Sequence, residues 1–184
     1  MQHDINDLIK LFDQSFYSQF NTKLIKGDDE PLYLPANDHC SYHQIVFAHG
    51  YYASALHEIA HWCVAGEARR SLEDFGYWYV PDGRSEAQQK VFEQVEIKPQ
   101  ALEWAFCVAA NKPFNVSADN LNGTQADTVA FKELVYQQVK NYLIVGFPAR
   151  AQQFINILAA FYKVESPLKV EQFNQDTELA TCLS

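Results

Sequence analysis

The stretch that decides the fold is ALHEIAHWCVAGEARR, residues 55–70, in which the arrangement His-Glu-x-x-His stands on an otherwise apolar segment. Residues four apart share one face of an α-helix, so His57 and His61 can reach a single metal ion. Glu58 lies beside them, where metal hydrolases carry the general base that acts on a metal-bound water. Two histidines and a glutamate buried on an apolar helix need polar partners, which a metal supplies. We therefore predict a metal-binding helix over residues 54–65 rather than a pair of structural histidines.

A third protein ligand is expected, because two helical histidines leave the coordination incomplete. The carboxylates that follow the motif and could supply it are Glu67, Asp74, Glu96 and Glu103. In one class of helix-based zinc peptidases the third ligand is a glutamate on a second helix behind the motif helix, which favours the region 96–103. We expect Glu96 to complete the site, with Glu67, Asp74 and Glu103 as the alternatives.

Ligand type alone leaves two chemistries open. Two histidines, one glutamate and an open position suit hydrolytic zinc. The same ligands suit non-haem ferrous iron, which activates dioxygen. A zinc-dependent metallopeptidase or related hydrolase is therefore the main alternative to an oxygen-using enzyme. A non-catalytic domain with a closed metal site is a further alternative, which His49 at ligand distance would favour.

The composition is that of a globular chain of 184 residues, with 48% apolar residues, 20% charged residues and a formal net charge of −9. This acidic balance argues against broad nucleic-acid binding and against a metal-dependent ribonuclease. The first residues lack the pattern of a signal peptide, and no apolar run is long enough to cross a membrane. The four cysteines form no C-x-x-C pair and are expected to be reduced. We expect a cytoplasmic protein with neither a nucleic-acid nor a membrane partner.

The apolar spacing predicts a single α+β metal-binding domain over residues 1–184, mainly helical with a small sheet. Helices are expected over 4–20, 54–65, 127–145 and 149–163, and another from Pro99 to about residue 110. Extended segments are expected within 26–35, 44–50, 74–84 and, with a weaker pattern, 91–97. The tail from Ser166 carries no pattern that assigns it.

Long blocks around the motif resemble one family. HEIAHWCVAG, with IVFAHGYYASA before it and FGYWYVPDGR after it, closely resembles the bacterial elongation factor P hydroxylases. NTKLIKGDDEPLYLPA, VEIKPQALEW and PFNVSADNL resemble them too, so the likeness runs from about Asn21 to Phe161. The resemblance implies an enzyme that hydroxylates a lysine of elongation factor P after other enzymes have attached a β-lysyl group to it. This is the last step of that modification, and the fold implied differs from the jelly-roll iron oxygenases.

The resemblance also implies the cofactors and the roles of the site residues. His57 and His61 would bind the metal with Glu96, and Glu58 would steer protons. The metal implied is Fe(II) used with dioxygen, although zinc competes for such ligands in purified protein. The basic constellation with which jelly-roll oxygenases hold 2-oxoglutarate is not readable in this sequence. The organic cosubstrate, the carbon hydroxylated and the oligomeric state are therefore left unassigned.

The substrate implied is a long cationic side chain, which carboxylates and aromatic rings would receive. Candidate substrate-binding residues are Asp29, in the acidic turn GDDEP, Tyr77, in the aromatic stretch, and His49, just before the motif helix. Each has a structural alternative, because acidic turns are usually solvated and aromatic strands usually pack in a core. His49 could equally be a hydrogen-bonded core residue or orient a metal ligand.

Overall fold

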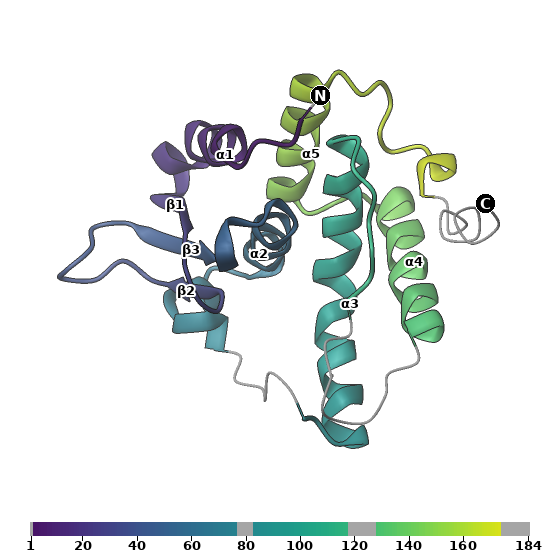
Figure 1. The fold of residues 1–184 in the computed structure, drawn as a ribbon, viewed down its shortest axis with the longest axis horizontal. Helices are drawn as coiled ribbons and strands as arrows, with labels where there is room; N and C mark the ends of the chain where they lie inside the picture. The colour runs from purple at the N-terminus through teal and green to yellow at the C-terminus, as the bar shows by residue number, and fades with distance from the viewer. Residues whose placement is uncertain (1, 77–82, 118–127, 174–184) are drawn as a thin grey trace.

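The computed structural model describes residues 2–76, 83–117 and 128–173. This part of the chain is mainly helical with a small sheet, as the α+β prediction requires (Figure 1). Its helices and strands are α1 (Ile5–Phe20), β1 (Thr22–Lys26), β2 (Leu32–Leu34), β3 (His43–Phe47), α2 (Tyr52–Val64), α3 (Glu86–Ala109), α4 (Thr128–Val145) and α5 (Ala149–Tyr162). Short 3-10 turns lie at Ala48–Gly50, Arg69–Ser71, Glu73–Gly76 and Val170–Gln172.

The first helix forms where its capping residue and apolar spacing predict it. The Asp4 side chain accepts a hydrogen bond from the Asn6 backbone N–H at 2.8 Å and so begins α1. Asn21, in the left-handed conformation, ends it. The buried stripe of α1 contains Phe12 and Phe16, whose rings lie 5.2 and 5.1 Å from the ring of Trp62 on α2. The predicted helix over 4–20 is confirmed, and it packs directly on the motif helix.

The small sheet comes just before the motif helix along the chain. Its strand order is β1-β3-β2, with β1 parallel and β2 antiparallel to β3. The strand predicted at 44–50 is confirmed as far as Phe47, but residues 48–50 form a 3-10 turn in which His49 has a φ of 53°. The extended segment within 26–35 supplies β2, whereas β1 was not predicted because its alternation covers only five residues. The turn after β3 leads straight into α2.

The helix α3 corrects two predictions. The strand expected at 91–97 is wrong, and so is a helix that starts at Pro99, because both segments belong to one helix of 24 residues. Ser85 and Gln88 form a capping box that starts this helix well upstream. Pro99 lies inside it and is buried. The extra turns matter because they bring Glu96 onto a helix.

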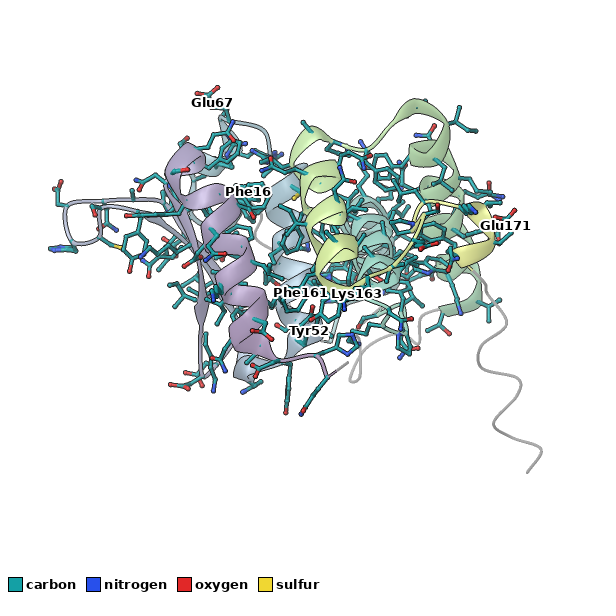
Figure 2. The ribbon with its side chains drawn as sticks, turned by 90° about the horizontal axis from the view of Figure 1, so that it is seen from above. Phe16, Tyr52, Glu67, Phe161, Lys163 and Glu171 are labelled. Atoms are coloured by element: carbon teal, nitrogen blue, oxygen red, sulfur yellow. The ribbon has the colours of Figure 1, made fainter. Side chains whose placement is uncertain are left out.

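The long helix α3 stands at the centre of the molecule, with α4 on one side and α2 and the sheet on the other (Figure 1). Seen from above, α1 and α5 lie side by side (Figure 2). One hydrophobic core joins all five helices and the sheet. The helices predicted at 127–145 and 149–163 are confirmed as α4 and α5, and the described tail ends at the buried Phe173. None of the described helices is long and apolar enough to cross a membrane.

Candidate metal centre

The two motif histidines lie one turn apart on α2 and face α3, which brings Glu96 to them. Nε2 of His57 and Nε2 of His61 are 3.0 Å apart. Oε1 of Glu96 lies 3.2 Å from Nε2 of His61, and Oε2 lies 3.4 Å from Nε2 of His57. Bonds of about 2.0 Å at the tetrahedral angle place ligand atoms about 3.3 Å apart. The three side chains therefore converge with the spacing of a metal site, and they form a group that could hold an ion.

Glu96 shows a feature that favours a bound cation. Its side chain is only 1% exposed, and among the described residues Oε1 has no hydrogen-bond donor. The polar neighbour of Oε1 is Nε2 of His61 at 3.2 Å, and a bound cation would give this buried oxygen a direct ligand bond. The residues therefore fit a divalent transition-metal ion, for which imidazole and carboxylate are suitable ligands.

The charges of the cluster point the same way. Burial lowers the pKa of His57, but the charge of Glu96 and the hydrogen bond to Glu103 outweigh it and raise the pKa to about 10. Burial raises the pKa of Glu96, but the neighbouring His61 and His57 outweigh it and lower the pKa to about 2. Both shifts show that this pocket stabilises positive charge next to an ionised carboxylate. A metal ion would place such a charge there in exchange for protons.

Glu103 reaches the same histidine from the other side. Nδ1–H of His57 donates a hydrogen bond to Oε2 of Glu103 at 2.8 Å. The contact directs Nε2, the other ring nitrogen, toward His61 and Glu96. A carboxylate in this position fixes the tautomer and the orientation of a ligand histidine. Glu103, one of the alternative third ligands, is thus placed behind His57 rather than in the group that could bind an ion.

The other two alternatives lie elsewhere. Glu67 follows α2, is exposed and points away from the body of the molecule (Figure 2). Asp74 accepts a hydrogen bond from the Tyr33 backbone N–H at 2.8 Å, through Oδ1. Of the four candidate carboxylates, Glu96 is the one that the structure groups with both histidines.

A cleft of about 450 Å³ opens onto the cluster. One side is α2, with Ser54, His57 and Glu58, and the opposite side is α3, with Glu96, Gln100 and Glu103. Burial raises the pKa of Glu58, against the attraction of His61 and His57. A carboxyl group whose pKa is raised beside a metal can hold or pass on a proton.

The candidate substrate residues are placed differently from one another. His49 is exposed, with its ring 5.7 Å from that of Tyr51, and is not among the residues that line the cleft. Asp29 is exposed, two residues before Pro31, which lines the cleft. Tyr77 lies outside the described residues. Thus neither Asp29 nor His49 lies in the cleft lining or in the group that could hold an ion, although Pro31 and Ala48, close to them in sequence, line the cleft.

Two buried polar residues of the cleft were not predicted from the sequence. Arg84 is 1% exposed, and its guanidinium lies 3.8 Å from the centre of the Phe92 ring. Gln100 is also 1% exposed and contacts Glu96. Gln100 and Glu103 follow Glu96 by four and seven residues, so they share its face of α3. A continuous helix across Pro99 would have revealed this stripe.

The fold and the site define a protein with a candidate centre of two histidines and one carboxylate, built on a pair of helices. Comparison with known families gives a match to the elongation factor P hydroxylases over residues 11–173. The chain therefore belongs to the elongation factor P hydroxylase family. A relative from Haemophilus influenzae, named Elongation factor P lysine hydroxylase, is 55% identical over 174 residues, covering 95% of this chain and 98% of the relative.

Proposed function

We propose that this chain hydroxylates a lysine side chain of elongation factor P at a metal centre formed by His57, His61 and Glu96. The observation that carries the proposal is the convergence of the three side chains, with one oxygen of the buried Glu96 carboxylate near each histidine, into a group that could hold an ion. The identity with a named elongation factor P lysine hydroxylase over nearly the whole of both chains supports the choice of substrate.

The metal in this proposal is ferrous iron. Two histidines and one carboxylate with open positions are the ligand set of non-haem iron oxygenases. Bound iron supplies the activation of dioxygen that hydroxylation of an unactivated carbon requires. Zinc would occupy the same ligands without supplying that chemistry, so zinc in purified protein would inhibit.

Residues of the chain would orient the metal ligands, transfer protons and admit the substrate. Glu103 holds the His57 ring, so that Nε2 faces the centre. Glu58 lies on the cleft wall beside the ligands, where its carboxyl group would hold and transfer the proton that oxygen chemistry consumes. The cleft between α2 and α3 would admit the lysine side chain and exclude bulk water from its inner end.

The proposed substrate lysine carries a β-lysyl group, and hence ammonium groups that carboxylates would recognise. Glu58 and Glu103 line the cleft, and Asp29 is proposed as a further carboxylate contact because it is exposed and comes two residues before Pro31 of the lining. His49 and Tyr77 stay as proposed contacts for the body of elongation factor P. Because this substrate is a translation factor, the reaction would take place in the cytoplasm.

The test is the intact mass of β-lysylated elongation factor P after incubation with the chain loaded anaerobically with ferrous iron and then exposed to air, with ascorbate as reductant. The wild-type chain should add one oxygen atom, and His57→Ala should add none. Glu67→Ala, which removes an exposed carboxylate, should act like the wild type. Cleavage of peptides by the zinc-loaded chain, with no gain of oxygen on elongation factor P, would contradict the proposal in favour of a metallopeptidase.

A further inference from the structure

The side chain of Gln100 joins two parts of the site. Its Nε2 donates to the Ser117 carbonyl at 2.6 Å, and its Oε1 accepts the Ser117 backbone N–H at 3.0 Å. The second proton of Nε2 points to Oε2 of Glu96 at 3.3 Å. Gln100 thus uses both of its donor protons and its carbonyl oxygen in hydrogen bonds while 1% exposed. Such a fully used buried amide fixes what it touches.

These contacts determine how the amide must lie. Oε1 can only accept, so the Ser117 N–H fixes it on one side, and Nε2 must then face both the Ser117 carbonyl and Glu96. Glu96 receives this proton on Oε2, whereas Oε1 has no donor among the described residues and lies 3.2 Å from Nε2 of His61. The two carboxylate oxygens are therefore unequal, and the inequality comes from Gln100.

The segment held by Gln100 is part of the cleft. Asn115 and Ser117 both line it, on the stretch that follows α3. Because Gln100 binds both backbone groups of Ser117, it fixes this end of the wall, while Phe114 stacks on Trp104 at the other end. The same amide therefore touches a proposed metal ligand and the wall that a substrate would meet.

We propose that Gln100 is a positioning residue that presents Oε1 of Glu96 to the metal and fixes the wall at Asn115–Ser117. The inference rests on the proposed metal centre, and it assigns the residue that sets the geometry of that centre. It also makes metal binding and the order of the wall interdependent, since both use one side chain.

The first test compares Gln100→Met with Gln94→Met, because methionine keeps the length of glutamine and removes its hydrogen bonds. Gln94 is exposed on the same helix and serves as the matched control. In a competition titration with a chelator, the Zn²⁺ affinity of Gln100→Met should fall about 10- to 100-fold, the usual effect of removing a partner of a metal ligand. Gln94→Met should bind Zn²⁺ like the wild type.

The second test measures amide hydrogen exchange at Ser117 and is independent of activity. In the wild type, Zn²⁺ should slow exchange at Ser117 more than at Val164, whose N–H bonds to Ala159 at the distant end of α5. In Gln100→Met, exchange at Ser117 should be faster and should no longer respond to Zn²⁺. The wild-type measurement decides this part even if the variant does not fold.

The outcomes separate the inference from the proposed function. Wild-type zinc affinity in a folded Gln100→Met, or no effect of Zn²⁺ on Ser117 in the wild type, would overturn the role of Gln100 and leave the metal centre standing. Failure of the wild-type chain to bind Zn²⁺ would overturn the centre itself, and this inference with it.

Discussion

The helix α2 has two faces, and at each of them lies one buried polar atom without a hydrogen-bond partner among the described residues: one belongs to α2 itself and the other to α3. On the core face it is Nε1 of Trp62, and opposite the site face it is Oε1 of Glu96. The first is a neutral N–H in a cluster of aromatic rings, with the Arg150 guanidinium 4.5 Å from the centre of its own ring. The second is an oxygen of an ionised carboxylate that converges with two imidazoles.

This difference separates a packing defect from a binding site. A neutral N–H costs about 1–3 kcal/mol when buried alone, and aromatic packing of the large Trp62 side chain can offset that. A buried carboxylate costs several times more and needs a compensating charge. The core face therefore holds α2 in place, and the site face keeps two imidazoles beside a buried carboxylate, a group that could hold a cation.

The largest effect is expected on the core face. Trp62→Ala removes a fully buried indole that contacts Phe12, Phe16 and Phe20, so the free energy of unfolding should fall by about 3–5 kcal/mol. Urea denaturation measures the change. Tyr51→Ala, at an exposed aromatic just before α2, should cost less than about 0.5 kcal/mol. Similar losses in both variants would contradict the division of α2 into two faces.

The next effect belongs to the site face. Zn²⁺ at about 100 times its dissociation constant should stabilise the wild-type chain by about 2.7 kcal/mol, because the assembled site exists only in the folded state. Excess chelator should remove the gain. Glu96→Gln should show little or no gain, since an amide is a poor replacement for an ionised ligand. Equal stabilisation of the wild type and Glu96→Gln in thermal unfolding would place the metal elsewhere.

A smaller effect on stability is expected at the C-terminal end of α2. The Arg150 guanidinium donates to the carbonyls of Trp62, Cys63 and Ala65, which the helix leaves without intrahelical partners. Arg150→Met should lower the free energy of unfolding by about 1–2 kcal/mol. Lys169→Met, which removes an exposed charge, is the matched control in the same urea titration. No difference between the two would show that Arg150 does not stabilise the helix end.

The smallest effect is expected on Zn²⁺ affinity when Glu103 is replaced. Glu103→Gln keeps an acceptor for Nδ1–H of His57 but removes the charge, so Zn²⁺ affinity should fall about tenfold, or about 1.4 kcal/mol. Glu103→Ala should lose more. Complete loss of binding in Glu103→Gln, with binding retained in Glu96→Gln, would exchange the roles of the two glutamates.

Sequence reasoning reached the motif helix and the residue types of the site, because four-residue spacing and ligand chemistry are local. It identified His57 and His61 from their spacing and selected Glu96 by likeness to helix-based metal enzymes. Local pattern failed at α3, where the alternation in VFEQVEI and the presence of Pro99 suggested a strand and then a new helix. The capping box at Ser85 and the packing of α3 against α2 and α4 outweigh both signals.

The wrong division of α3 into a strand and a later helix kept the other residues of the site from being predicted. With residues 91–97 read as a strand, Glu96, Gln100 and Glu103 do not share a face, so neither the partner of His57 nor that of Glu96 could be seen. The Gln100 contact with Ser117 also joins residues 17 apart through backbone atoms, for which side-chain patterns carry no signal. His49 stays a prediction, since it follows Ala48 of the cleft lining but is not itself among the lining residues.

The most direct test of the central claim is anomalous diffraction from crystals grown anaerobically with ferrous iron, measured on both sides of the iron absorption edge. We expect one iron bound by Nε2 of His57, Nε2 of His61 and Oε1 of Glu96, with Glu103 still on Nδ1 of His57. An iron bound by Glu103 or by Glu67, or no iron between α2 and α3, would contradict it.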